Sequence, residues 1–328
     1  MHRLDQKLAR IRSGKYKKAD FIIADAKDGD MGPSLTSSAP KRAKDGSWNR
    51  YHTREEFLDN IEAIIKQDIV DIMLVSASNL ERLVERGAFR KSKVKPAIRA
   101  NDTTDIWHPR GATYATRPAR PFRTADLGRV RRFCDLVLYA VTFNNDLDHD
   151  LATVEAYRAF RHEAAALGVR HFLEVFDPNA PAGIAPADVG AFVNDWIVRV
   201  LAGTTADERP VFLKVAYNGA RSMAELAEHD PSLVVGILGG GTGTTRDTFE
   251  LLSRAEASGA RVALFGRKIQ HAASQAGILA GMRRVLGGER SPEDAVRDYH
   301  AELDRAGIAP LLPLEDDLRI TERVLLAE

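Results

Sequence analysis

The stretch Pro210-Val-Phe-Leu-Lys214-Val-Ala-Tyr217 is a short apolar run that contains one lysine. Runs of this length, rich in β-branched and aromatic residues and separated by longer amphipathic stretches, are typical of strands in a parallel sheet. This run is the sixth of eight along the chain. The expected strands are 21–25, 71–76, 95–99, 136–142, 171–176, 211–217, 233–238 and 261–265.

Amphipathic stretches predict a helix after most of these strands. The expected helices are 54–66, 79–86, 124–133, 150–167, 186–201, 220–228, 245–258 and 271–286, and a further one opens at Ser291-Pro292. Alternation of single strands and helices implies right-handed crossovers, and eight such units close into a barrel. We predict an α/β fold, a (β/α)8 TIM barrel forming a single domain over residues 1–328, with strands at about 21–265 and a C-terminal helical extension at about 290–328.

Composition excludes several classes of protein. With 47 basic and 46 acidic side chains, a general nucleic-acid or membrane-surface binder is not expected. The sequence has no long apolar run, so we expect no membrane span. It has no apolar leader at its N-terminus, so we expect no signal peptide. The single cysteine, Cys134, precedes an apolar strand and is expected to be a buried structural thiol rather than a nucleophile. We therefore expect a soluble, cytoplasmic protein.

Two charged residues lie within apolar strands. Strand alternation places Lys214 on one face with Phe212, and Glu174 on one face with Phe172. A charge facing the helix layer would be costly, so both side chains are expected inside the barrel mouth, next to each other. Burial disfavours the charged form of a lysine, and a neutral amine is what Schiff-base formation requires. The alternative is an ion pair with a structural role only.

Two glycine-containing turns follow the seventh and eighth strands. They consist of Gly239, Gly240, Gly241, Thr242 and Gly243, and of Gly266, Arg267 and Lys268. Glycines let backbone N–H groups approach an anion, and these turns occupy the usual phosphate position of this barrel type. Arg267 or Lys268 would supply the positive charge. A tight turn without a ligand is the plainer interpretation.

Further candidates follow the first, third and fourth strands. Carboxylates at Asp25, Asp28 and Asp30 could act in catalysis, and a Mg²⁺ site is a minor alternative to the metal-free site that we favour. Arg99 and Asp102 end the third strand and are expected to bind substrate. Tyr139 and Asn144, near the end of the fourth strand, are expected to complete the pocket.

Two connections are long enough to carry a function. Residues 27–52 follow the first strand, and residues 101–123 follow the third. The second connection carries Arg110, Arg117, Arg120 and Arg123. It is either an arginine-bearing lid over an anionic substrate or a solvated or subunit-contacting arm.

These residues together resemble the class I, Schiff-base aldolase superfamily, in particular tagatose-bisphosphate, sulfofructosephosphate and archaeal-type fructose-bisphosphate aldolases. The resemblance runs through Phe-Leu-Glu174-Val, Leu-Lys214-Val, Gly239-Gly-Gly241 and Phe-Gly266-Arg-Lys268-Ile. It implies a Schiff base on Lys214, proton transfer by Glu174, an acid at Asp25 or Asp28, and a phosphate held by the last two turns. It also implies a homo-oligomer and no cofactor. The strand 136–142 lacks the second lysine found in many relatives.

The sequence therefore predicts a lyase that makes or breaks a carbon–carbon bond in a small phosphorylated or otherwise anionic ketose. Two alternatives remain at this point. One is a phosphosugar isomerase or epimerase, with or without Mg²⁺, that uses Glu174 or an aspartate as base. The other is an inactive barrel that binds a sugar phosphate.

Overall fold

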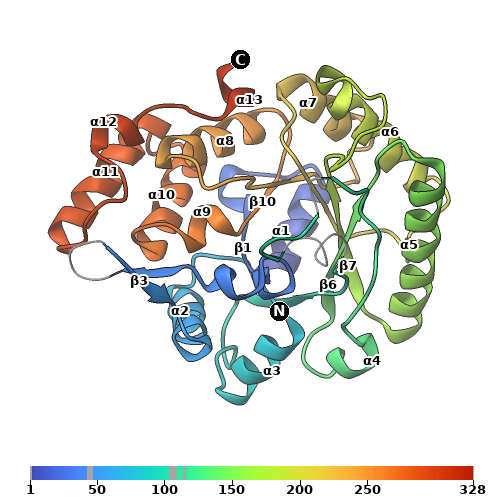
Figure 1. Cartoon of the computed structure of the whole chain (residues 1–328), viewed down its shortest axis with the longest axis horizontal. Coiled ribbons are helices and arrows are strands. Elements are labelled where there is room, and N and C mark those ends of the chain that lie inside the picture. Colours follow the sequence, from blue (N-terminus) through green and yellow to red (C-terminus); the bar gives the residue numbers. More distant parts are fainter. Residues whose placement is uncertain (1, 43–46, 103–108, 114–115, 328) are drawn as a thin grey trace.

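Eight parallel strands close into a barrel surrounded by helices (Figure 1). The computed structural model describes residues 2–42, 47–102, 109–113 and 116–327. The barrel strands are β1 (Ile22–Lys27), β4 (Ile72–Val75), β5 (Lys95–Arg99), β6 (Leu136–Thr142), β7 (Arg170–Phe176), β8 (Leu213–Val215), β9 (Gly236–Leu238) and β10 (Val262–Phe265). Their order around the barrel follows the sequence, so the predicted (β/α)8 barrel is confirmed.

Helices follow the barrel strands as the amphipathic pattern predicts. They are α2 (Arg54–Gln67), α3 (Ala77–Glu85), α4 (Leu127–Val130), α5 (Leu147–Leu167), α6 (Val189–Leu201), α7 (Ala220–His229), α8 (Thr245–Ala257), α9 (Arg267–Gln270) and α10 (Gln275–Gly287), with short 3-10 turns at Lys18–Asp20 and Pro186–Asp188. The helix expected at 124–133 is a single turn. Thr124 donates two hydrogen bonds to the Asp102 carboxylate, which holds the chain out of the helix until Asp126 caps it.

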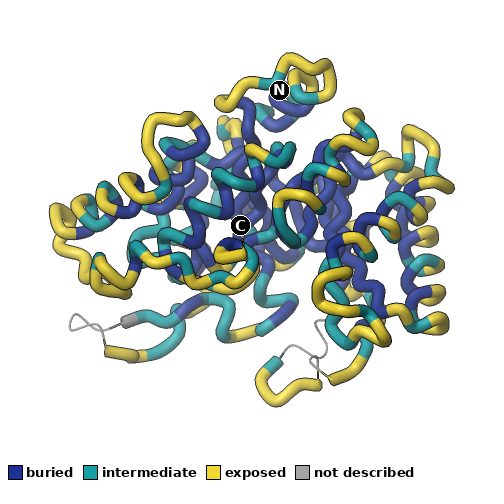
Figure 2. The backbone as a smooth tube through the Cα atoms, turned by 90° about the horizontal axis from the view of Figure 1, so that it is seen from above, coloured by how far each residue is buried: buried dark blue, intermediate teal, exposed yellow. Residues whose placement is uncertain are grey.

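The apolar core has two layers that follow from the alternation of side chains along each strand. Inside the barrel lie Ile22, Ala24, Leu138, Phe172 and Phe212. The other face of the same strands packs against the helices, where most of the core residues gather. The buried part of the chain accordingly forms the centre of the molecule, with exposed residues on loops and on the outer helix faces (Figure 2).

An N-terminal helix that we did not predict closes the amino end of the barrel. Helix α1 (Arg3–Arg12) inserts Leu4 and Leu8 into the inner core layer. Lys7 of the same helix donates to Phe21 O at 2.9 Å and to the carboxylate of Asp71 at 2.9 Å. Among the described residues, this end of the barrel is therefore filled by α1.

The C-terminal extension packs on the outside of the barrel. It contains α11 (Pro292–Arg305), α12 (Leu314–Asp317) and α13 (Arg323–Leu326), and α11 contacts both α8 and α10. Near the chain end, Thr321 donates to the carboxylate of Asp247 at 2.5 Å. The extra C-terminal helices are confirmed, and they bring the tail to the start of α8.

The long connection after β1 is structured. It contains two 3-10 turns, Gly29–Met31 and Ser34–Ser38, and an antiparallel hairpin of β2 (Pro40–Arg42) and β3 (Trp48–Tyr51). We refer to residues 29–42 and 47–51 as the lid, because they cover the carboxyl end of the barrel.

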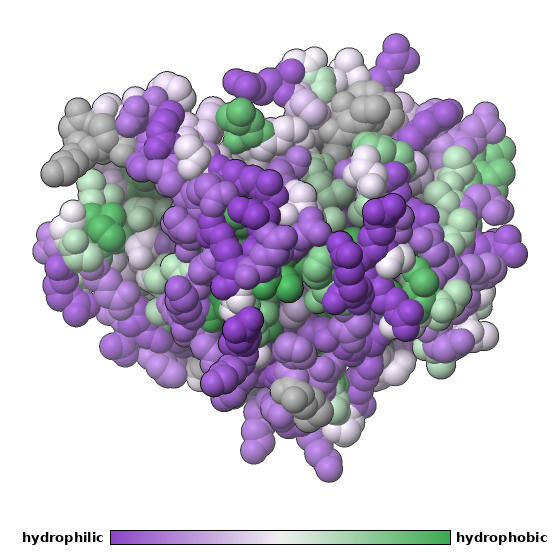
Figure 3. Space-filling view, turned by 90° about the horizontal axis from the view of Figure 1, so that it is seen from below, coloured by the Kyte–Doolittle hydropathy of each residue, from purple (hydrophilic) through white to green (hydrophobic). Residues whose placement is uncertain are grey.

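The outer surface shows no large apolar face in the view of Figure 3, where hydrophobic residues form small separate areas among hydrophilic ones. Among the helices in the described ranges, none has the length and apolar character needed to cross a bilayer.

Candidate active site

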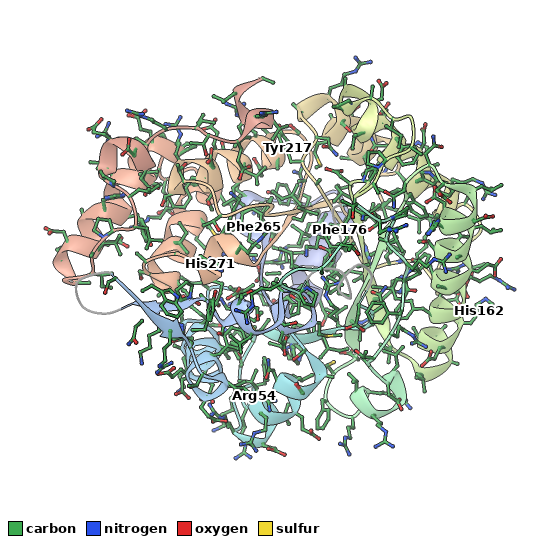
Figure 4. All side chains as sticks on the ribbon, viewed as in Figure 1. Arg54, His162, Phe176, Tyr217, Phe265 and His271 are labelled. Carbon is green, nitrogen blue, oxygen red and sulfur yellow. The ribbon has the colours of Figure 1, made fainter. Side chains whose placement is uncertain are left out.

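A cavity of about 620 Å³ lies at the carboxyl ends of the barrel strands. Its wall is built from β1, β5, β7, β8, β9 and β10 and from the lid. Cavities of roughly 300–1,000 Å³ are typical of sites for small molecules. In Figure 4, Phe176 lies near the barrel centre and His271 lies toward α9 and α10, and both line this cavity, whereas His162 lies at the periphery on α5.

Lys214 and Glu174 meet in this cavity. Their strands are neighbours, and Glu174 lies directly opposite Lys214 in the parallel register. Their side chains form an ion pair, with Glu174 1% and Lys214 7% exposed. Directly below in the barrel, Phe172 stacks on Phe212 with ring centroids 4.5 Å apart. The amine is thus held by rigid strands on an apolar base, in the position that alternation predicts.

Arg99 extends this pair into a chain of four charges. Its Nη2 atom donates to Glu174 Oε2 at 3.1 Å, and its Nε atom donates to Asp28 Oδ2 at 2.7 Å. All three residues are less than one-tenth exposed. Each buried carboxylate therefore has a cationic partner, which is the condition for keeping charges in a largely dry site.

Asp25 does not lie among the residues that line the cavity, contrary to our expectation. Alternation along β1 turns Ala24 and Ala26 to the barrel interior and Asp25 away from it, while Lys27, at the end of the strand, is among the residues that line the cavity. Asp25 Oδ2 lies 3.1 Å from Lys27 Nζ, which also donates to Gln275 at 2.9 Å. Burial raises the pKa of Asp25 and lowers that of Lys27. Asp28, not Asp25, is the acid of this strand that reaches the cavity.

Each of the two glycine turns has some residues that line the cavity and others that do not. Gly239, Gly240, Gly266 and Arg267 line the cavity, whereas Gly241, Thr242, Gly243 and Lys268 are not part of its wall. At Gly266 a Cβ atom would stand 3.0 Å from the backbone oxygen of Ala26, so a side chain here would crowd the backbone of β1.

Lys268 does not face the cavity, which corrects our expectation for this residue. Its Nζ atom lies 2.6 Å from Glu322 Oε1 of the C-terminal tail, and its side chain is fully buried. The single helical turn α9 sends neighbouring side chains in different directions, so Arg267 and Lys268 cannot both face the cavity. The positive charge of Lys268 is matched by the tail.

Asp102, Tyr139 and Asn144 are also placed elsewhere. The Asp102 carboxylate is occupied by Thr124, as described above. Tyr139 turns to the helix layer, where it stacks on Phe160 at 4.2 Å, because its neighbours Leu138 and Ala140 take the inner positions of β6. Asn144 donates to Asn179 at 3.0 Å in the loops beyond the cavity. Contrary to our expectation, none of these three residues is part of the wall of this cavity.

The three acids at and after the end of β1 do not converge on one point. Asp25 pairs with Lys27 and Asp28 with Arg99, while Asp30 accepts hydrogen bonds from Ser76 at 2.5 Å and Asn79 at 3.0 Å. Within the part of the chain that the structure describes, no three potential metal-binding side chains cluster.

The lid contributes cavity residues that sequence reasoning did not single out. Thr36, Ser37 and Tyr51 line the cavity, as do Gln270 and His271 after β10. Part of the arginine-bearing connection, residues 103–108 and 114–115, lies outside the described residues; none of its other residues after Arg99 lines the cavity, and Arg123 pairs with Glu163. The length of the first connection was the only sequence signal for the lid.

Neither a protein-family model nor a curated protein sequence matches this chain. Solved structures do. An archaeal fructose 1,6-bisphosphate aldolase superposes with a TM-score of 0.62 at 12% identity, covering 87% of this chain and 99% of that one. An archaeal fructose-1,6-bisphosphate aldolase with its catalytic Lys covalently bound to the carbinolamine intermediate gives 0.61 at 13% identity, covering 87% and 100%.

A protein from Corynebacterium glutamicum gives a TM-score of 0.60 at 18% identity, covering 88% of this chain and 98% of that one. Identities this low establish a common fold and nothing finer. The resemblance predicted from the strand motifs is thus confirmed at the level of architecture: this chain has the (β/α)8 barrel fold of the Schiff-base-forming aldolases.

Proposed function

We propose that this protein is a class I aldolase-type lyase that makes or breaks a carbon–carbon bond in a small phosphorylated or otherwise anionic ketose. The observation that carries the proposal is the Lys214 amine, held beside Glu174 in a cavity at the catalytic end of the barrel. A lysine on a rigid strand, with an acid–base group in contact, is the arrangement that imine chemistry needs.

Lys214 first adds to the ketose carbonyl carbon as a neutral amine, and the resulting carbinolamine loses water to give an imine. A base then takes the proton of the hydroxyl on the β-carbon. The bond between the α- and β-carbons breaks, its electron pair moves to the iminium nitrogen, and an aldehyde leaves. Protonation of the enamine and addition of water release the ketone product and restore the amine.

Glu174 is the group that moves protons in this scheme. It contacts the amine directly, so it can accept a proton from the ammonium form and return it to the carbinolamine hydroxyl that leaves as water. Arg99 holds the second oxygen of Glu174 and links it to Asp28, which lines the same cavity. Asp28 is the candidate for contacts with substrate hydroxyls.

The anionic group of the substrate would lie against Gly239, Gly240, Gly266 and Arg267. These residues form the part of the cavity wall after β9 and β10. Backbone N–H groups of glycine turns and an arginine guanidinium are suited to phosphate oxygens. The chain of four charges that includes Lys214 and these two turns line one cavity, so one substrate could contact both.

Trapping with borohydride tests the proposal. The protein is incubated with dihydroxyacetone phosphate or a ketose phosphate and then reduced with sodium borohydride. After digestion, mass spectrometry measures the mass of the peptide that contains Lys214. We expect a reduced adduct on Lys214 that disappears in Lys214→Met. Lys66→Met, at an exposed lysine of α2, is the matched control and should retain the adduct.

An unmodified Lys214 together with turnover of a phosphoketose would reject the Schiff base and favour an isomerase or epimerase with Glu174 as base. An unmodified Lys214 with binding but no turnover would favour an inactive barrel.

A further inference from the structure

Charged side chains around the cavity are matched almost completely by one another. Lys214 pairs with Glu174, and Arg99 bridges Glu174 and Asp28. Lys27, which also lines the cavity, pairs with Asp25 of the same strand. The three cations Lys214, Arg99 and Lys27 are thus balanced by three carboxylates. None of these cations has an unmatched positive charge for a bound anion.

Arg267 differs from these cations. It is exposed on the cavity wall beside Gly266, and among the described residues no carboxylate forms an ion pair with it. His271, on the same side of the cavity, stays neutral because burial, with Arg267 and Lys27 nearby, lowers its pKa. The wall formed by the described residues therefore has one unmatched positive charge, and it stands at the glycine turns.

The lid part of the wall is uncharged. Its lining residues Thr36, Ser37 and Tyr51 carry hydroxyl groups, and those of Thr36 and Ser37 donate to Pro33 O and Ser34 O and keep their oxygen atoms as acceptors. Phe176 of β7 adds an apolar surface to the cavity. The nearest charged lining residues in sequence are the acid Asp28 and the cation Lys27, whose charge is matched by Asp25. This side of the cavity can hydrogen-bond to sugar hydroxyls, but its described residues supply no cation that lacks a carboxylate partner.

We infer that the cavity accepts a ketose with a single phosphate, held by Arg267 and the glycine turns, and discriminates against a bisphosphate. This inference rests on the proposed function and narrows its substrate class. A phosphate carries a charge of about −1.5 to −2 at neutral pH. A second such group would lie beside the uncharged lining residues of the lid and the carboxylates of Asp28 and Glu174, where it would lose hydration without gaining a counterion.

Calorimetric titration of the unmodified protein tests the inference. Fructose 1-phosphate, fructose 6-phosphate and fructose 1,6-bisphosphate are compared at one pH and one salt concentration. We expect at least one monophosphate to bind about tenfold or more tightly than the bisphosphate, which corresponds to one unmatched charge in a partly dry site. A bisphosphate that binds as tightly as both monophosphates, or more tightly, would overturn the inference.

Two variants locate the discrimination. Arg267→Gln should reduce monophosphate binding toward that of unphosphorylated fructose, whereas Arg129→Gln, at an exposed arginine of α4, makes the same change of charge and should have no effect. Thr36→Lys places a cation in the lid and should narrow the gap between bisphosphate and monophosphate. If Arg267→Gln binds the monophosphate as well as the unmodified protein does, the anion lies elsewhere and the inference fails.

The two experiments distinguish failure of the lyase proposal from failure of the single-phosphate inference. Borohydride trapping reports on Lys214, while titration reports on charge. An adduct on Lys214 with equal binding of all three esters would remove only the single-phosphate inference. Preferential binding of a monophosphate without an adduct on Lys214 would support the single-phosphate inference and reject the proposed lyase activity.

Discussion

Glu174 on β7 and Lys214 on β8 stand directly opposite each other in the parallel register, and their side chains form a buried ion pair at the carboxyl end of the barrel. Both residues are fixed by strands rather than by loops. Their separation is therefore set by the hydrogen-bonded sheet, which gives a candidate acid–base and nucleophile pair a rigid frame.

Replacement of Glu174 by glutamine tests its role in proton transfer. Glu174→Gln keeps the size of the side chain but removes the negative charge next to Lys214. We expect kcat to fall by a factor on the order of 10²–10⁴, the usual contribution of a general acid–base group. Steady-state kinetics measures this, with Glu155→Gln on the surface of α5 as the control. Unchanged kcat in Glu174→Gln would assign the residue a structural role only.

Phe212 supports the site from below. It is fully buried inside the barrel and stacks on Phe172 at 4.5 Å. Phe212→Ala should lower the free energy of unfolding by about 3–5 kcal/mol, because the barrel cannot collapse around the cavity that the ring leaves. Urea denaturation provides the measurement. A loss below about 1 kcal/mol would show that the inner layer repacks, which close packing argues against.

His171 should make the fold sensitive to acid. It is buried in the helix layer, 2.8 Å from the Tyr157 hydroxyl, and burial lowers its pKa to about 3. The unfolded imidazole binds a proton below its ordinary pKa of about 6.5, so stability should decline as the pH falls from there toward 3, by at most about 1.4 kcal/mol per unit.

Thermal unfolding between pH 7 and 4 checks this prediction for His171. His171→Gln should show a shallower decline than the unmodified protein, whereas His162→Gln, on the exposed side of α5, should keep the full slope. Identical slopes for all three proteins would mean that other groups dominate the acid response.

Cys134 should be an unreactive thiol. It is 6% exposed and donates weakly to Leu136 O at 3.5 Å, and burial raises its pKa to about 11. Little thiolate exists at pH 8, so iodoacetamide should label the native protein slowly and the urea-unfolded protein fast. Mass spectrometry after timed quenching follows the reaction. Rapid labelling of the native protein would contradict the buried placement.

The barrel could be predicted because its signal is local and repeated. Each strand is a short apolar run, and a period of two decides which side chains point inward. Applied to Phe212 and Lys214, or to Phe172 and Glu174, this rule gives the observed directions. The helix α1 was missed although Leu4 and Leu8 have helical spacing, because nothing in a ten-residue segment shows what it packs against.

Where strand alternation was not used to choose the cavity residues, the structure places the chosen side chains elsewhere. Counting strands placed Tyr139 at the cavity and the resemblance named Asp25 or Asp28, but alternation along β6 and β1 turns Tyr139 and Asp25 away from the barrel interior. The prediction that Lys268 binds the anion differs from the structure for another reason. Its partner Glu322 lies 54 residues further along the chain, and no local pattern links the two.

The sequence alone determined the strand–helix alternation, the closed barrel and the inward direction of the Lys214 and Glu174 side chains, because these depend on periodicities of two and 3.6 residues within short segments. Tertiary structure alone decided which cation remains unmatched: Glu322 reaches Lys268 from the chain end, while Arg267 faces the cavity without a partner among the described residues. Such pairings depend on how segments far apart in sequence come together, and electrostatic energies depend on those distances in space.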